Sequence, residues 1–306
     1  MVAGAERLIV IAGPTGVGKT ATAVALASRL PIEVISADSR QVYRGLDAAT
    51  GKPTAFERAA VRHHLIDILD PADRYHAARF RDDALAALAA IRSRGRLPVV
   101  VGGTGLYIRA LLRGLDPAPP ADPQFRAALA AVAERGGRQA LHERLQREAP
   151  ALAERLHPND SVRIIRALEL ARAGPVRMQA WSRPTSAFPV VYIGLTMDRV
   201  QLVARLRTRC SVMASAGLAA EVERLLARGH DETLPALQGI GYRDFVRVVC
   251  GRVSAAEALS IMQRDTIRYA KRQLTWFRRE PDIEWIDVER AGGPSGVAAL
   301  VEERVV

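Results

Sequence analysis

A glycine-rich segment near the N-terminus constrains the fold of this chain more than any other feature. It comprises Gly13, Pro14, Thr15, Gly16, Val17, Gly18, Lys19 and Thr20. These residues match the pattern G-x-x-x-x-G-K-[ST]. The apolar run Leu8–Ala12 before them predicts a buried strand, and the Ala-rich stretch 18–30 after them predicts a helix that ends at Pro31. The chain is therefore expected to contain a P-loop, the phosphate-binding turn that is typical of nucleotide- and ATP-binding proteins.

The chemistry of such a loop follows from its residue types. Glycines let successive N–H groups point at phosphate oxygens, and the helix N-terminus adds partial positive charge. Lys19 is expected to reach the terminal phosphate, and the Thr20 hydroxyl is expected to bind Mg²⁺, which prefers oxygen ligands. The loop indicates a diphosphate or polyphosphate ligand but does not specify a reaction.

A nucleotide hydrolase of the motor type normally has an apolar strand that ends in an acidic residue. The candidate strand Val99–Val101 instead leads into Gly102, Gly103 and Thr104. This disfavours an ATPase and leaves small-molecule kinases and other phosphate-handling transferases.

Predicted strands alternate with predicted helices over most of the chain. Further strands are expected at Glu33–Ser36, Val190–Leu195 and Ile283–Ile286, and further helices at 82–94, from Asp198 onward and from Ser254 to about Arg279. This alternation predicts an α/β fold with a P-loop core and a mostly parallel sheet. Residues 124–173 read as helical without a strand, between a breaker cluster at 116–123 and prolines at 175, 184 and 189.

We therefore predict a discontinuous core domain at 1–115 and 190–290. A helical insertion domain at 116–189 interrupts it, and a C-terminal tail at 291–306 follows it.

Composition excludes several classes of protein. Of the 306 residues, 49% are hydrophobic and 25% are charged, as in a globular protein. The only cysteines, Cys210 and Cys250, rule out a disulfide scaffold or a Cys-rich zinc module, and the pair His63-His64 has no third ligand at metal spacing. The apolar run 8–13 is too short for a signal peptide or a membrane span, so a cytoplasmic protein without membrane contact is expected.

The net charge of +11 has two interpretations. A broad basic surface suits a polyanion such as RNA, whereas a chain rich in Arg can also use that residue merely to solvate its surface. Lysine occurs only at Lys19, Lys52 and Lys271. This bias hints that Lys is kept where the wider guanidinium of Arg does not fit.

Asp38 follows the second predicted strand. Strand C-termini line the ligand crevice of a doubly wound sheet, so its carboxylate is expected near the phosphate loop. There it could act as a general base or lie just outside the ligands of a magnesium ion, although a helix-capping role is also open.

With these residues, the sequence resembles the bacterial type of tRNA dimethylallyltransferase, a family that is also called the tRNA isopentenyltransferases. The resemblance runs from about Leu8 to about Trp285, and eight ordered blocks carry it. They are GPTGVGKT at 13–20, SADSRQVYRGLD at 36–47, ATGKP at 49–53, HHLID at 63–67, VGGTGLY at 101–107, HPNDSVRIIRALE at 157–169, GIGYRD at 239–244 and YAKRQLTWFR at 269–278.

The resemblance implies transfer of a dimethylallyl group from dimethylallyl diphosphate to the exocyclic amine of the adenosine 3′ of tRNA anticodons. The loop would then bind the donor's diphosphate instead of ATP, with Mg²⁺. Asp38 matches the family's base, and Thr104 matches a position at the reaction channel. Arg205 lies where the family has a diphosphate-binding Arg, but Arg209 shares its helix face and the choice stays open.

The resemblance also implies contacts with the anticodon stem-loop of tRNA. The residues implied are Asp38, Ser39, Arg40, Gln41, Thr104, Arg126, Val162, Arg163, Ile164, Ile165, Arg166, Gln238, Gly239, Ile240, Gly241, Tyr242 and Arg243. Arg163 and Arg166 are three apart and hence on one side of a helix. A monomer is expected.

Two departures from the family and three alternatives remain. Ala48 and Ala49 stand before Thr50 where the family often has a Gly, and the Cys/His finger of eukaryotic members has no counterpart here. The alternatives are a P-loop small-molecule kinase, an adenylate isopentenyltransferase that acts on free AMP, and a non-catalytic nucleic-acid-binding protein.

Overall fold

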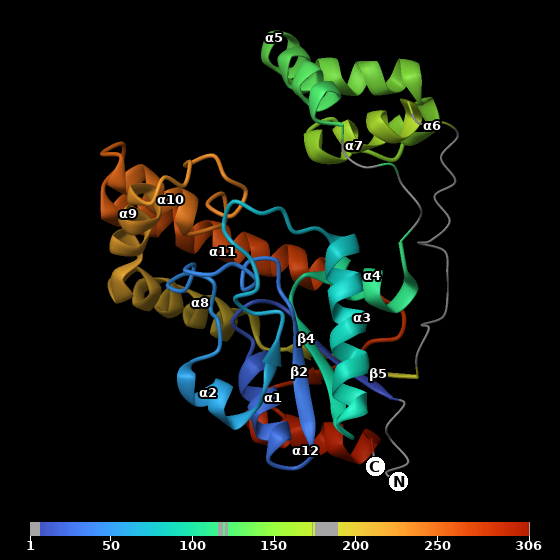
Figure 1. Cartoon of the computed structure of the whole chain (residues 1–306), viewed down its shortest axis with the longest axis vertical. Coiled ribbons are helices and arrows are strands. Elements are labelled where there is room, and N and C mark those ends of the chain that lie inside the picture. Colours follow the sequence, from blue (N-terminus) through green and yellow to red (C-terminus); the bar gives the residue numbers. More distant parts are fainter. Residues whose placement is uncertain (1–6, 116–118, 120–121, 173, 175–188, 306) are drawn as a thin grey trace. The chain divides into compact units, whose positions relative to one another are not determined.

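A computed structural model describes residues 7–115, 119, 122–172, 174 and 189–305 (Figure 1). The chain divides into two compact units, one comprising 1–114 and 185–306 and the other 115–184. The predicted division lies at 115/116 and 189/190. Most of the predicted breaker cluster at 116–123, and the prolines 175 and 184, lie outside the described residues. The two units are described separately.

The larger unit is built on one six-stranded sheet in which every strand pairs in parallel. The strand order is β3-β2-β4-β1-β5-β6. Their bounds are Leu8–Ala12 for β1, Ile32–Ala37 for β2, His63–His64 for β3, Leu97–Gly102 for β4, Val190–Thr196 for β5 and Glu284–Asp287 for β6. The apolar runs of β1, β2 and β4 are buried at every residue, as expected where helices cover both faces of a parallel sheet. The predicted α/β class is confirmed.

Helices cover both faces of this sheet (Figure 1). Their bounds are Lys19–Ala27 for α1, Ala55–Ala60 for α2, Ala77–Ser93 for α3, Gly105–Arg113 for α4, Arg199–Met213 for α8, Ala219–Ala227 for α9, Tyr242–Val249 for α10, Ala255–Phe277 for α11 and Gly293–Val305 for α12. A single π-helical turn, Ala214–Leu218, joins α8 to α9. The predicted starts of two helices are confirmed, because their first residues act as caps: Asp198 accepts the N–H groups of Val200 and Gln201, and Ser254 accepts that of Glu257.

Three apolar clusters hold the larger unit together. One joins alternate residues of the central strands to α1 and α12, and a second joins the opposite face to α3 and α4. The third packs α8 to α11 against the loop that carries Val42, Tyr43 and Leu46. Helix α11 contributes to all three, with Met262 in the third cluster, Ala270 in the first and Phe277 in the second. It therefore connects the helical edge of this unit to the sheet.

The segment 291–306 is not a separate tail, contrary to the prediction. Residues Gly293–Val305 form α12, which packs on α1. Val297, Val301 and Val305 recur at every fourth position and bury in the sheet cluster, so this segment belongs to the core domain. The short elements α2, β3, α4 and α10 were also not predicted.

All the regular secondary structure in the described residues of the smaller unit is helical. Its helices are α5 at Pro123–Glu148, α6 at Pro150–Ala153 and α7 at Ser161–Arg172. Gly137 interrupts α5 with φ of +69°. A small core of Leu129, Leu141, Leu145, Ile164 and Leu168 joins α5 to α7. Across the described parts of both units, no helix is long and apolar enough to cross a membrane.

Candidate active site

The phosphate loop lies between the end of β1 and the start of α1, as predicted. Gly13, Gly16 and Gly18 all have positive φ, at 146°, 80° and 108°. A Cβ on Gly13 would lie 2.7 Å from the carbonyl oxygen of Leu195, and one on Gly16 would lie 2.6 Å from a methyl group of Leu206. The loop therefore packs closely against β5 and α8. At Gly13 and Gly16, only glycine suits both the backbone conformation and the packing.

Lys19 begins α1 and turns its ammonium back over the loop. Its Nζ donates to the carbonyl oxygens of Gly13 at 3.0 Å and Pro14 at 2.7 Å. Burial lowers the pKa of this amine to about 7, Asp38 opposes the shift, and Arg209 adds to it. An anion bound at the loop would restore the full positive charge.

Asp38 follows β2, and its side chain forms a tight turn with the next residues. Its Oδ1 accepts the N–H groups of Arg40 at 2.8 Å and Gln41 at 3.3 Å. Its Oδ2 has no hydrogen-bonding partner within the described part of the chain. Because its charge acts on both Lys19 and Arg209, the carboxylate lies beside the phosphate loop with one oxygen free to accept a proton.

Thr104 follows β4 and joins the same region. Its Oγ1 accepts the N–H of Ser39 at 3.3 Å, and its side chain is hydrogen-bonded to Tyr269 of α11. Burial, with a smaller contribution from Asp38, raises the pKa of the Tyr269 hydroxyl to about 12, so it stays protonated. The ends of β1, β2 and β4 thus bring Lys19, Asp38 and Thr104 to one edge of the sheet.

The two arginines of α8 differ in environment. Arg205 is exposed, whereas Arg209 is half-buried and its charge acts on both Lys19 and Asp38. A Cβ on Gly51, which has φ of +61°, would lie 1.7 Å from the Arg209 guanidinium. The absence of a side chain at Gly51 therefore makes the space that Arg209 occupies beside the loop.

The neighbours of Asp38 are held by the polypeptide around them. Arg40 donates to the carbonyl oxygens of Pro235 and Ala236. Gln41 donates to the carbonyl oxygen of Gly51 at 2.9 Å and accepts from the Ser36 hydroxyl at 2.8 Å. The turn is consequently rigid where it faces the phosphate loop.

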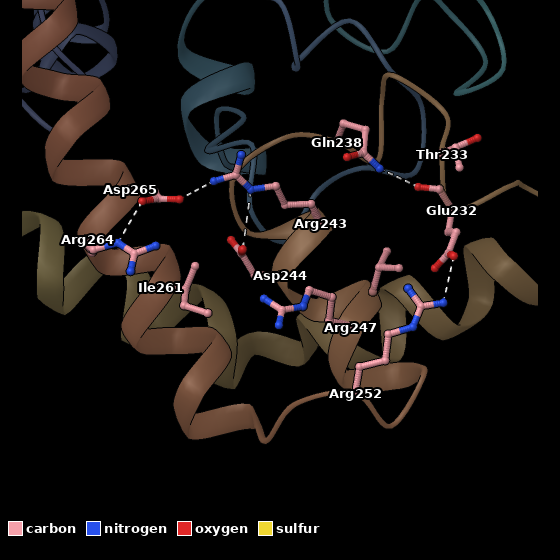
Figure 2. Close-up of a pocket in the computed structure, with 11 residues that line it drawn as sticks. Glu232, Thr233, Gln238, Arg243, Asp244, Arg247, Arg252, Ile261, Arg264 and Asp265 are labelled. Carbon is pink, nitrogen blue, oxygen red and sulfur yellow. Dashed lines mark hydrogen bonds and ion pairs between the residues drawn. The ribbon is translucent and has the colours of Figure 1, made fainter. Parts of the chain in front are cut away.

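Two residues expected to contact tRNA line a cavity of about 460 Å³ between α10 and α11 (Figure 2). Gln238 donates to the carbonyl oxygen of Glu232 at its rim, and Arg243 is paired with Asp265. Arg247 also lines this cavity, and among the described residues its guanidinium has no hydrogen-bonding or ion-pair partner (Figure 2). The cavity wall thus carries one cation that is available to an anion.

Tyr242 does not belong to that surface. It is 1% exposed, and its hydroxyl donates to Glu221. The same carboxylate accepts the N–H groups of Asp47 at 2.9 Å and Ala48 at 3.2 Å. Tyr242 is therefore a packing residue that helps to fix the turn at Asp47 and Ala48, and its side chain cannot contact RNA. Gly239 and Gly241 beside it are buried, and Ile240 is half-buried.

In the helical unit too, the residues expected to contact tRNA include both exposed and buried side chains. Val162 is 81% exposed, and Arg163 is also exposed, whereas Ile164 is fully buried and is a core residue. The prediction of RNA contact is thereby corrected for the Ile164 side chain. Ile165 is half-buried against the same core.

A buried carboxylate positions the two other arginines of that unit. Arg126 and Arg166 both donate to Glu169, at 2.6 Å and 2.9 Å. These hydrogen bonds outweigh burial and lower the pKa of Glu169 to about 2, so the carboxylate stays charged. Arg126 and Arg166 remain part-exposed while bound to it.

Sequence reasoning assigned no role to one polar residue that contacts the loop. Gln273 of α11 is 6% exposed, and its amide lies between the backbones of Thr15 and Gly103. The available signal was its position: it shares a helix face with Ala270 and Phe277, where a polar side chain needs buried partners. In the described residues, no group of three or more His, Cys, Asp or Glu side chains could hold a metal ion.

Comparisons with known proteins agree with this geometry. A family model described as IPP transferase matches residues 41–280, and one described as isopentenyl transferase matches residues 6–69. A tRNA dimethylallyltransferase 1 of Syntrophotalea carbinolica is 49% identical over 92% of this chain and 90% of that protein. A tRNA dimethylallyltransferase of Anaeromyxobacter dehalogenans is 46% identical over 97% of this chain and 100% of that protein.

Two solved structures are similar as well. A tRNA isopentenylpyrophosphate transferase from Bacillus halodurans has a TM-score of 0.73 and 40% identity and covers 98% of this chain and 97% of its own. A eukaryotic dimethylallyltransferase described as acting on tRNA has a TM-score of 0.74 and 26% identity, and covers 92% of this chain and 74% of its own.

Proposed function

The chain belongs to the IPP transferase family, and we propose that it transfers a dimethylallyl group from dimethylallyl diphosphate to the exocyclic amine of an adenosine in tRNA. The observation that carries this proposal is the convergence of Lys19, Asp38 and Arg209 at the sheet edge where the phosphate loop begins. By resemblance, the acceptor is the adenosine immediately 3′ of the anticodon. We expect the enzyme to act as a cytoplasmic monomer.

The phosphate loop supports the donor half of this reaction. The loop N–H groups, the N-terminus of α1 and the Lys19 ammonium would bind the diphosphate and stabilise the charge that grows on it as the carbon–oxygen bond breaks. Arg209, held beside the loop by the gap at Gly51, adds a second cation. A guanidinium can bind two phosphate oxygens at once.

Mg²⁺ fits this arrangement as a partner of the diphosphate. Thr20 supplies one hydroxyl in the first turn of α1, and the described residues contain no group of three or more His, Cys, Asp or Glu side chains that could hold a metal ion. This donor set suits an ion that keeps water and phosphate oxygens as most of its ligands. When bound, Mg²⁺ would supply positive charge to the departing diphosphate.

Asp38 supports the acceptor half. The lone pair of the adenine amine is delocalised into the ring, so the amine needs a base as its bond to the allylic carbon forms. The free Oδ2 of Asp38 would accept the amine proton, while Oδ1 stays bound to the turn at Arg40 and Gln41. The products are N6-dimethylallyladenosine in the tRNA and diphosphate.

The RNA half rests on exposed and part-exposed groups of both units. Val162 and Arg163 on α7 are exposed, and Gln238 lies at the cavity rim. Arg247, which has no partner among the described residues, is available to RNA, whereas Arg243 would have to leave Asp265 to bind it. Arginine can bind phosphate with two hydrogen bonds or stack on unpaired bases. Because the amine must reach Asp38, the target base has to leave its stack.

The decisive experiment supplies labelled dimethylallyl diphosphate and Mg²⁺ to the purified full chain with three separate acceptors. They are unmodified tRNA with adenosine 3′ of the anticodon, the same tRNA with guanosine there, and AMP. We expect label only in the first, and we expect Asp38→Asn to abolish transfer while the donor still binds. Label in AMP would identify an adenylate isopentenyltransferase. No transfer, with tight binding of ATP, would identify a kinase.

A further inference from the structure

The side chain of Gln273 is hydrogen-bonded to two backbone segments that lie far apart in the sequence. The N–H of Thr15, inside the phosphate loop, donates to Gln273 Oε1 at 2.8 Å. Gln273 Nε2 donates in turn to the carbonyl oxygen of Gly103 at 2.9 Å, one residue before Thr104. One buried amide thus holds the loop and the turn after β4 at a set separation.

Only a neutral amide, or an equivalent group with one acceptor and one donor, satisfies both contacts. A carboxylate accepts from Thr15 but places negative charge against the Gly103 carbonyl, and a thioether or alkyl chain leaves both backbone groups without a partner. Such groups cost free energy when they are buried. A Cβ on Gly103 would lie 2.2 Å from Gln273 Nε2, so the fit is close on this side too.

The neighbours of Gln273 on α11 contact the same turn. Tyr269, one turn earlier, is hydrogen-bonded to Thr104. Trp276, nearly one turn later, packs so closely on the next residue that a Cβ on Gly105 would lie 2.1 Å from its indole nitrogen. The 103–105 turn therefore lies along the face of α11 that carries Tyr269, Gln273 and Trp276. Gln273 also contacts the phosphate loop.

We propose that Gln273 is a positioning residue that sets the phosphate loop for the diphosphate of the donor. By engaging the Thr15 N–H, it fixes the peptide that follows Pro14, one of the two residues whose carbonyls hold Lys19. By engaging Gly103, it holds that loop in register with Thr104, which by resemblance lies at the reaction channel. The inference rests on the proposed function only for the identity of the donor.

The test measures binding of inorganic diphosphate with Mg²⁺ to the full chain by titration calorimetry, independently of any transfer. Gln273→Met keeps the length of the side chain and removes both polar contacts. We expect it to weaken diphosphate binding about tenfold or more, because the N–H of Thr15 is no longer held in one orientation. In the transfer assay, the KM for dimethylallyl diphosphate should rise while the KM for tRNA stays within about twofold.

A second variant separates positioning from mere packing. Gln273→Glu accepts from Thr15 but cannot donate to Gly103 until its carboxyl group is protonated. Relative to the wild type at the same pH, we expect weak diphosphate binding at pH 8 and recovery toward wild-type affinity at pH 6. A packing role alone would give a deficit that does not change with pH.

Gln263 provides the matched control. It lies on the same helix, where its amide contacts the Arg207 carbonyl and Ser211 hydroxyl on α8, away from the loop. Gln263→Met and Gln263→Glu should bind diphosphate as the wild type does. Wild-type affinity in Gln273→Met, or equal losses in the Gln263 variants, would overturn the inference. Failure of the wild type to transfer dimethylallyl groups would instead overturn the proposed function and leave the binding result valid.

Discussion

Lys19 occupies a space that suits a thin side chain with a compact charge. Its ammonium lies within 3.0 Å of the Gly13 and Pro14 carbonyl oxygens, inside a loop that is itself packed against β5 and α8. Lys19→Arg keeps the charge but inserts a wider planar group. We expect loss of roughly a hundredfold or more in kcat/KM for transfer, measured in the labelled-donor assay. Turnover at the wild-type rate would contradict this account of the loop.

The titration of Lys19 should link donor binding to proton uptake. Its pKa is about 7 because burial disfavours the ammonium. A bound diphosphate favours the ammonium and raises that pKa, so binding above pH 7 takes up a proton and donor affinity falls as pH rises. Calorimetry in two buffers of different ionisation enthalpy should detect this uptake at pH 8. Lys19→Met should bind more weakly and lose the Lys19 contribution to the uptake.

Arg209 and Arg205 offer a direct comparison of two similar side chains one turn apart. Arg209 lies beside the loop in the space left by Gly51, whereas Arg205 is exposed. We expect Arg209→Ala to reduce kcat/KM for the donor about a hundredfold, and Arg205→Ala to change it by less than about threefold. A larger effect at Arg205 would reverse this assignment. Circular dichroism of both variants would verify that they fold.

A buried carboxylate anchors the edge of the sheet where β2 meets β3 and α3. Glu33 of β2 accepts from Arg94 at 2.7 Å and 2.9 Å and contacts His64 of β3 at 2.7 Å. The hydrogen bond from Arg94, more than any other contact, lowers the pKa of Glu33 to about 2. His64, one of the pair His63-His64, therefore has a structural contact with a buried carboxylate.

Because that pKa is lowered, Glu33 stabilises the fold above its ordinary pKa of 4.5 and loses this contribution as pH falls toward 2. Urea unfolding should show Glu33→Gln to be less stable than the wild type by about 2 kcal/mol at pH 7. The difference should shrink steadily below pH 4.5. A difference that stays constant down to pH 3 would mean that packing, and not charge, is responsible.

The starts of helices could be predicted from the sequence, whereas the packing of helices on one another could not. The capping residues Asp198 and Ser254 could be recognised because a cap depends only on the next three residues. The docking of α12 on α1 could not, since Val297 and Val301 find their partners on an element from the opposite end of the chain. The burial of Tyr242 depends likewise on Glu221, which lies on the neighbouring helix α9.

For the whole molecule, the net charge of +11 now has a candidate partner in tRNA. The logarithm of tRNA affinity should fall linearly with the logarithm of salt concentration, by about 0.7 to 0.9 per phosphate contacted. Arg163→Ala on α7 should reduce this slope by about one contact. Arg62→Ala is the matched control, because both side chains are 64% exposed but Arg62 lies at the β3 edge of the sheet. Equal slopes for Arg163→Ala and the wild type would exclude a phosphate contact at Arg163.

The sequence alone was sufficient for the phosphate loop, the buried parallel strands and the family. Each depends on neighbours along the chain: Gly16 and Lys19 lie in one short pattern, and β1 is a continuous apolar run. Only the tertiary structure distinguished Arg209 from Arg205, because identical residues one turn apart carry the same local signal. The distinction comes from Gly51, and the role of Gln273 comes from Thr15 and Gly103, all of them contacts that form only when distant segments pack together.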